Sequence, residues 1–109
     1  MAMLARALVQ QTRILLLDEP TSHLDLSNKG RMLHILRRLA EQGTTVVFTT
    51  HDPESAVFIA RYLILMREGQ VLDAGPLENV LTAEKLTATY NTPVQVIQVQ
   101  DRPVVLLEG

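Results

Sequence analysis

Two acidic residues, Asp18 and Glu19, stand side by side where a run of large aliphatic residues at positions 14–17 ends. The run predicts a strand buried on both faces, which is typical of a parallel sheet, and sites in such sheets lie beyond the carboxyl ends of the strands. Adjacent carboxylates repel each other, so burying them is costly unless a cation or a proton-transfer role offsets the cost. The pair therefore favours a site for Mg²⁺ together with a phosphate group.

A histidine, His51, follows a second predicted strand at residues 44–50, which is rich in β-branched and aromatic side chains. Between the two strands, residues 28–42 place aliphatic side chains at helical spacing, and Gly43 is suited to end that helix. A helix between two such strands predicts a right-handed βαβ unit. The two acids and His51 should then face the same edge of the sheet.

The rest of the chain predicts further helices and hairpins around this unit. The predicted elements are a short amphipathic helix at 2–10, a helix from Pro53 to Arg61, a hairpin with strands at 62–66 and 70–74, a helical segment at 77–90 with a break near Thr82, and a hairpin with strands at 94–100 and 104–107. We expect the last hairpin to be an appendage and not part of the core.

Composition bounds the class of protein. The chain has 109 residues, enough for one domain, with 47% hydrophobic and 20% charged residues. No apolar run approaches the roughly 20 residues that span a bilayer, and no secretory signal is apparent, so we expect a cytoplasmic location. The absence of cysteine excludes disulfides and thiolate metal sites. A formal net charge of -2 gives no signature of nucleic-acid binding.

The sequence LLLDEPTSHLD at 15–25, followed by TTHD at 49–52, resembles the Walker B strand, D-loop and switch histidine of the ATP-binding-cassette (ABC) ATPases. The resemblance covers nearly the whole chain. It implies an α/β fold, the carboxyl-terminal part of a P-loop NTPase cassette with parallel core strands, plus a peripheral β-hairpin and a C-terminal tail. In this view residues 1–76 belong to the ATPase core and residues 77–109 form a C-terminal extension.

The resemblance also implies roles for three side chains. Asp18 would hold the Mg²⁺ that bridges the outer phosphates of ATP, and Glu19 would orient and deprotonate the attacking water. His51 would reach the γ-phosphate and help to hold that water, so it counts as both a catalytic and a cofactor-binding residue. The alternatives are a helix-capping Asp18, a surface carboxylate at Glu19 and a structural His51.

Other polar residues are less closely tied to chemistry. Ser22, Leu24 and Asp25 match the D-loop, which in this family lies at the interface with a second ATPase subunit, although a plain strand-to-helix turn is the alternative. For four further basic residues we expect solvated positions instead of ligand contacts. They are His23, His34, Arg61 and Arg67.

The stretches PTSHLDL at 20–26, FTTHDP at 48–53 and GPLENVLTAEKL at 75–86 are similar to ATPase subunits of importers for ferric siderophores, haem, cobalamin and metal oxyanions. The implied partners are transmembrane permease subunits and a second ATPase subunit, at the inner face of the membrane. The alternatives are a soluble non-transport ABC ATPase and a truncated, non-catalytic interaction module.

The chain contains no Gly-x-x-x-x-Gly-Lys-Ser/Thr phosphate loop and no signature loop, because its five glycines are isolated. We therefore expect this chain to belong to a longer reading frame. On its own it should bind Mg-ATP very weakly and not hydrolyse it.

Overall fold

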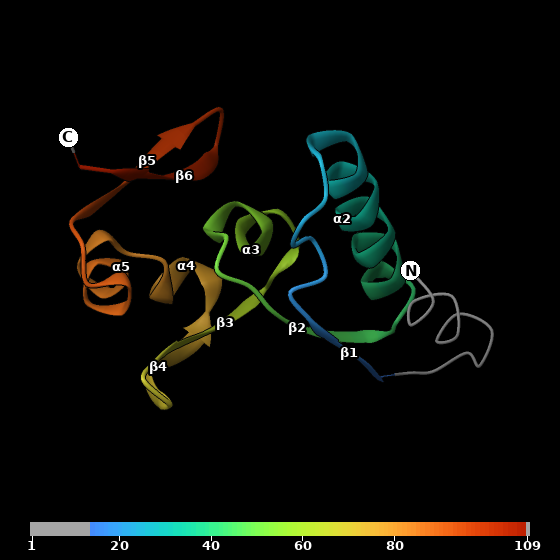
Figure 1. Ribbon diagram of the computed structural model, residues 1–109, viewed down its shortest axis with the longest axis horizontal. Helices are drawn as coiled ribbons and strands as arrows, with labels where there is room; N and C mark the ends of the chain where they lie inside the picture. The colour runs from blue at the N-terminus through green and yellow to red at the C-terminus, as the bar shows by residue number, and fades with distance from the viewer. Residues whose placement is uncertain (1–13, 109) are drawn as a thin grey trace. The chain divides into compact units, whose positions relative to one another are not determined.

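The computed structural model describes residues 14–108, which divide into two compact units between Ser55 and Ala56. The first unit contains strand β1 (Ile14–Asp18), helix α2 (Leu26–Glu41) and strand β2 (Thr45–Thr49). β1 and β2 pair in parallel, and the predicted strand-helix-strand order is confirmed (Figure 1). The helix predicted at 2–10 lies outside the described residues.

Hydrogen bonds and backbone conformation at its two ends explain where helix α2 begins and ends. The Asp25 side chain accepts a hydrogen bond from the amide of Asn28 (2.8 Å), which is the usual way to satisfy a free amide of the first turn. At the other end Gly43 adopts a φ of 98°, a left-handed conformation that glycine reaches without strain, and its amide donates to the carbonyl of Ala40 (3.1 Å). The prediction that Gly43 stops this helix is confirmed.

The prediction that β1 is buried on both faces is wrong. Leu15 is only 5% exposed, whereas Ile14 and Leu16 are 58% and 66% exposed. Successive side chains of a strand point to opposite faces, and in this unit α2 packs on β2 from one side only, burying Met32, Leu33 and Leu36. The other face, which also carries Val47, is solvent-accessible.

Helix α3 (Pro53–Ile59) follows β2 and leads into the second unit. There, strands β3 (Tyr62–Arg67) and β4 (Gln70–Pro76) form the predicted hairpin, antiparallel with a register shift at Leu65/Met66. Two short helices follow, α4 (Leu77–Val80) and α5 (Ala83–Tyr90). The predicted break is confirmed, because Thr82 caps α5 by accepting from the amide of Lys85 (3.2 Å).

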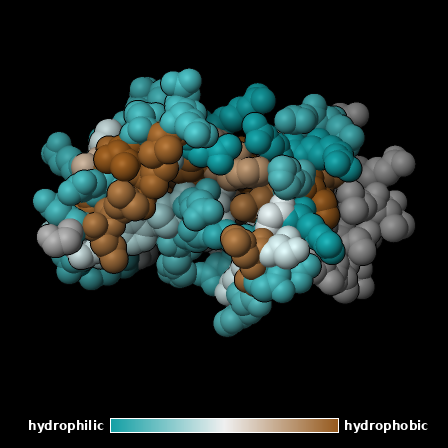
Figure 2. Space-filling view, turned by 90° about the horizontal axis from the view of Figure 1, so that it is seen from above, coloured by the Kyte–Doolittle hydropathy of each residue, from teal (hydrophilic) through white to brown (hydrophobic). Residues whose placement is uncertain are grey.

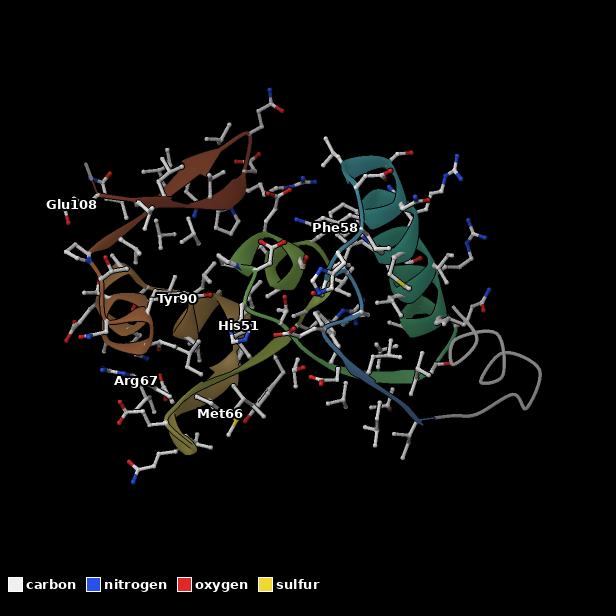
Figure 3. The ribbon with its side chains drawn as sticks, in the orientation of Figure 1. His51, Phe58, Met66, Arg67, Tyr90 and Glu108 are labelled. Atoms are coloured by element: carbon white, nitrogen blue, oxygen red, sulfur yellow. The ribbon has the colours of Figure 1, made fainter. Side chains whose placement is uncertain are left out.

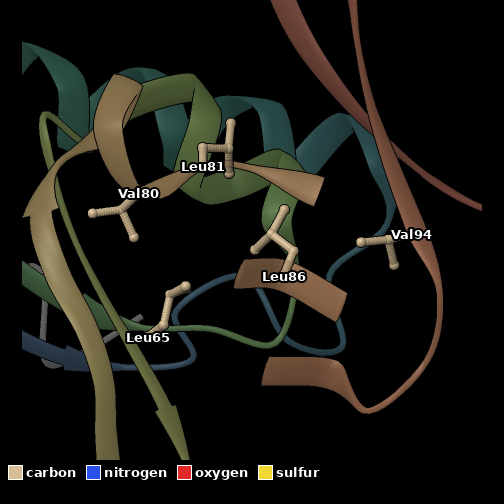
Figure 4. Close-up of a cluster of buried hydrophobic side chains, with 5 residues drawn as sticks. All are labelled: Leu65, Val80, Leu81, Leu86 and Val94. Atoms are coloured by element: carbon tan, nitrogen blue, oxygen red, sulfur yellow. The ribbon is translucent and has the colours of Figure 1, made fainter. Parts of the chain in front are cut away.

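The chain ends with the antiparallel pair β5 (Val94–Val99) and β6 (Arg102–Leu107). Residues of the hairpin, of α4 and α5 and of this pair share one buried cluster, shown in Figure 4; it consists of Leu65, Val80, Leu81, Leu86 and Val94. The expectation that the last hairpin is only an appendage is therefore wrong. Val94 is 5% exposed, and Val96 and Val105 pack against the same cluster.

One arginine of this unit also departs from expectation. Arg67, labelled in Figure 3, donates from Nη1 to the carbonyl of Ala88 (3.2 Å) and lies 3.8 Å from a Glu68 carboxylate oxygen, so it ties β3 to α5 instead of being merely solvated. Arg61 is exposed, as expected. The outer face of β5 and β6 carries an apolar patch, visible at the left of Figure 2, made of Ile97, Val99 and Leu106.

Candidate functional site

The candidate site lies at the carboxyl ends of β1 and β2. The parallel register runs from Ile14 opposite Thr45 to Asp18 opposite Thr49, so both strands end together. The segments that follow them carry Glu19 and His51. The structure therefore brings together the three residues, Asp18, Glu19 and His51, for which the sequence predicted chemistry.

Asp18 presents one bound and one open oxygen. Its Oδ1 accepts a hydrogen bond from the hydroxyl of Thr49, across the strand pair. Among residues 14–108, Oδ2 has no hydrogen-bond partner. Asp18 lies on the exposed face of β1, so this oxygen is accessible to a ligand from solvent.

Glu19 is held by its backbone in an uncommon conformation. Its φ of 46° lies in the left-handed region, which non-glycine residues occupy mainly where the surrounding structure requires it. Its amide donates to both the carbonyl (3.0 Å) and the hydroxyl (3.1 Å) of Thr49, and its carbonyl accepts from the amide of Ser22 (3.1 Å). These bonds fix the direction in which the Glu19 side chain leaves the strand.

The Glu19 carboxylate contacts the candidate switch histidine. Its Oε1 lies 2.8 Å from Nε2 of His51, whose side chain is 92% exposed while that of Glu19 is 36% exposed. Figure 3 labels His51 in the segment between β2 and α3. A carboxylate and an imidazole at this distance can form a hydrogen bond.

The segment between β1 and α2 is a compact turn. Thr21 is buried, Leu24 is half-buried with its amide donating to the Thr21 carbonyl (3.3 Å), and Ser22 is exposed. Asp25 has a local task as the cap of α2. His23, with a φ of 66°, is exposed, as is His34 on α2, in agreement with the solvated positions expected for both.

A polar network below this turn was missed in the sequence. Lys29 on α2 forms an ion pair with Asp52, whose Oδ2 also accepts from the hydroxyl of Ser55 (2.9 Å). The Ser55 hydroxyl lies 3.4 Å from that of Thr21, and both residues are buried. The network therefore joins the turn after β1 to the segment that carries His51. No spacing in the sequence links Lys29 to Asp52, so only the fold reveals it.

Charge and burial in this network shift two pKa values. The pKa of Asp52 is lowered from its ordinary 3.8; burial, the strongest single influence, would raise it, but the hydrogen bonds from Lys29 and Ser55 and the charge of Lys29 outweigh burial. The pKa of Lys29 is raised from 10.5, chiefly by its hydrogen bond to Asp52. Both groups are thus held in their charged forms.

The donor set suits a metal that is only partly coordinated by protein. Within the described range, no three His, Asp or Glu side chains are grouped so that they could enclose a metal ion. Mg²⁺ usually keeps several waters and takes one or two carboxylates plus phosphate oxygens. A single open oxygen on Asp18 fits that mode of binding.

None of the helices at 14–108 has the length and apolarity to cross a bilayer.

Comparisons with known proteins agree with these features. A family model described as "AAA domain, putative AbiEii toxin, Type IV TA system" matches residues 1–56. The hemin import ATP-binding protein HmuV of Rhodococcus jostii is 43% identical over 95 residues, which are 87% of this chain and 32% of that protein. The molybdate import ATP-binding protein MolC of Haemophilus influenzae is 44% identical over 93 residues, which are 84% of this chain and 36% of that protein.

A solved structure has the same fold. A putative metal-chelate type ABC transporter in an inward-facing conformation superimposes with a TM-score of 0.85 at 36% identity, over 97% of this chain and 44% of that one. The chain spans about a third of the length of the two import proteins. The chain therefore belongs to the AAA-domain family whose model it matches, and in sequence and fold it is similar to the ATP-binding proteins of ABC importers.

Proposed function

We propose that this chain is the carboxyl-terminal part of the ATP-binding and ATP-hydrolysing subunit of an ABC importer, which powers the uptake of a metal chelate or a related solute. The observation that carries the proposal is the meeting of Asp18, Glu19 and His51 at the ends of two parallel strands, with Glu19 Oε1 2.8 Å from His51 Nε2. Ligands of open parallel sheets bind at this edge.

Each of these side chains has a distinct task in the proposed reaction. Asp18 would hold Mg²⁺ through Oδ2, directly or through water, since Oδ1 is engaged by Thr49. When bound, the ion neutralises charge on the outer phosphates of ATP. Glu19 would accept a proton from the attacking water, and His51 would orient Glu19 and donate a hydrogen bond to the γ-phosphate.

The proposed partners follow from the same family. Ser22, Leu24 and Asp25 would face a second ATPase subunit, and permease subunits would anchor the assembly at the cytoplasmic side of the membrane. Residues 1–76 would belong to the ATPase core and 77–109 to an extension, although packing continues across that division through the cluster of Leu65, Val80 and Val94. Support comes from relatives that are named import ATP-binding proteins.

The class of solute is inferred from relatives alone. The two import proteins are named for hemin and molybdate, and the solved transporter is described as metal-chelate type. A metal-containing solute is common to these names. No residue at 14–108 is assigned to contact the solute.

A hybrid subunit tests the proposal. In this hybrid, residues 1–109 replace the part of the H. influenzae molybdate import protein that they match at 44% identity. The rest of that protein is kept, and the junction lies at the edge of the matched region. The hybrid subunit should hydrolyse ATP in a Mg²⁺-dependent manner, whereas the kept part alone should not. If the hybrid subunit folds and binds ATP but has no turnover, these residues do not supply a working hydrolytic site.

A further inference from the structure

Thr49 forms hydrogen bonds with both acids of the site. It is the last residue of β2 and lies opposite Asp18 in the parallel pair. Its hydroxyl donates to Asp18 Oδ1, and the same oxygen accepts from the amide of Glu19 (3.1 Å). The carbonyl of Thr49 accepts from that amide as well (3.0 Å).

The hydrogen-bonding capacity of the hydroxyl explains why both contacts can exist together. A threonine hydroxyl has one proton to donate and two lone pairs that accept. Here the proton is directed to Asp18 and a lone pair to the Glu19 amide. Valine has nearly the same shape as threonine but can make neither bond, whereas serine can make both.

Packing does not account for the hydroxyl. Thr49 is exposed on its strand, where any β-branched residue would suit the backbone. Thr45, at the other end of β2, is also exposed, and it lies opposite Ile14, which has no polar side chain. The two threonines therefore share a strand and a face but differ in their contact with the acids.

We propose that Thr49 is the positioning residue of this site. Its hydroxyl holds Oδ1 of Asp18, which leaves Oδ2 for a cation, and it helps to hold the left-handed backbone of Glu19, which directs the carboxylate toward His51. The inference deepens the proposed function, because it rests on Asp18 and Glu19 being the groups that bind Mg²⁺ and activate water.

The positioning itself is tested by NMR on the 109-residue chain without metal. In Thr49→Val, three-bond couplings should show Asp18 averaging over several χ1 rotamers, and the Glu19 amide should exchange with solvent about tenfold faster, the effect of weakening one hydrogen bond. Thr49→Ser and the control Thr45→Val should behave as wild type. A single Asp18 rotamer and unchanged Glu19 exchange in Thr49→Val would overturn the proposal.

A measurement on the unaltered chain guards against a variant that fails to fold. A hydroxyl that bridges Asp18 and the Glu19 amide requires one χ1 rotamer of Thr49, so its couplings should be those of a single conformer. Rotamer averaging at Thr49 in the wild-type chain would overturn the proposal without any substitution.

Paramagnetic broadening by Mn²⁺ separates this proposal from the function on which it rests. Mn²⁺ should broaden the amide signals of Asp18 and Glu19 in the wild type, Thr49→Ser and Thr45→Val. In Thr49→Val the same broadening should require a several-fold higher concentration of Mn²⁺. Equal broadening in all four proteins would overturn the role of Thr49 in presenting Oδ2. If no protein were broadened while Asp18 still averaged in Thr49→Val, the positioning would stand and the metal role of Asp18 would fail.

Discussion

Glu19 and His51 follow different strands, yet Oε1 of the carboxylate lies 2.8 Å from Nε2 of the imidazole. The parallel register ends both strands at the same level, and the left-handed φ of Glu19 turns its side chain toward the segment after β2. The fold of the chain therefore places the carboxylate beside the imidazole.

Removing the imidazole should slow turnover more than it weakens nucleotide binding. In the hybrid subunit, His51→Ala is expected to lower the rate of ATP hydrolysis by about tenfold or more, because Glu19 loses its orienting partner. His34→Ala is the matched control, since His34 is exposed on α2. Steady-state turnover at saturating ATP measures the effect. Equal rates for the two variants would argue against a catalytic part for His51.

The Lys29–Asp52 pair should make stability depend on pH in a defined window. Because the pKa of Asp52 is lowered from 3.8, the contribution of Asp52 to the free energy of unfolding is present above pH 3.8. It is lost as the pH falls through the pKa of Asp52 in the folded chain. Lys29, which also faces Glu54, has a pKa raised from 10.5, so its contribution to the free energy of unfolding is present below pH 10.5. This contribution is lost as the pH rises through the pKa of Lys29 in the folded chain. The pair should thus stabilise the chain at all intermediate pH values.

Lys29→Met tests this window by urea denaturation. Near neutral pH the substitution should lower the free energy of unfolding by about 1 kcal/mol. The value is moderate because the Asp52 side chain is 34% exposed. The difference from wild type should shrink below pH 3.8 and above pH 10.5. Arg37→Met, which removes an exposed pair with Glu41 (3.6 Å) on the same helix, should cost roughly 0.5 kcal/mol or less. A difference that did not vary with pH would show that the pair is not electrostatic in origin.

Two glycines near α2 should respond to alanine with opposite signs. Gly30 lies within the helix and an added Cβ would meet nothing within 4 Å, so Gly30→Ala should stabilise the chain by about 0.5–1 kcal/mol. Gly43 has a φ of 98°, which alanine reaches only with strain, so Gly43→Ala should destabilise it by roughly 1 kcal/mol. Thermal unfolding compares the two; the same sign for both would contradict the conformation at Gly43.

Two leucines of the second unit offer a similar comparison in packing. Leu86 is 1% exposed within the buried cluster, whereas Leu107 on β6 is 75% exposed. Leu86→Ala should therefore cost about 2–5 kcal/mol of the free energy of unfolding, and Leu107→Ala less than about 1 kcal/mol. Chemical denaturation of both variants measures the costs. Similar costs would mean that Leu107 is covered in solution.

Local patterns were enough to predict the helices and strands. Aliphatic spacing placed α2 within two residues of its observed bounds at Leu26–Glu41, and Gly43 and Thr82 end or begin helices as their chemistry indicates. The meeting of Asp18, Glu19 and His51 was also predictable, because parallel strands align their carboxyl ends. These properties depend on sequence neighbours and on one topological rule.

Properties that depend on which elements pack together were not predictable. Ile14 and Leu16 are as apolar as Leu15, and which of them is buried depends on the face of the strand pair against which the rest of the unit packs. Val94 likewise lies in the core of the second unit because it packs with residues from other elements, such as Leu65 and Leu86. The contacts of Thr49 with Asp18 and of Lys29 with Asp52 cross elements that are distant in sequence, and no spacing rule connects them.

The most direct test concerns Glu19 in the hybrid subunit. Glu19→Gln keeps the shape of the side chain and its contact distance to His51 while removing the base, so ATP binding should persist and hydrolysis should fall by roughly 100-fold or more. Glu54→Gln, an exposed acid in the first turn of α3, is the control and should keep normal turnover. Single-turnover hydrolysis of bound ATP, measured for both variants, decides the matter. Glu19→Gln should retain bound ATP uncleaved, and near-normal cleavage in that variant would contradict the assignment of Glu19 as the base.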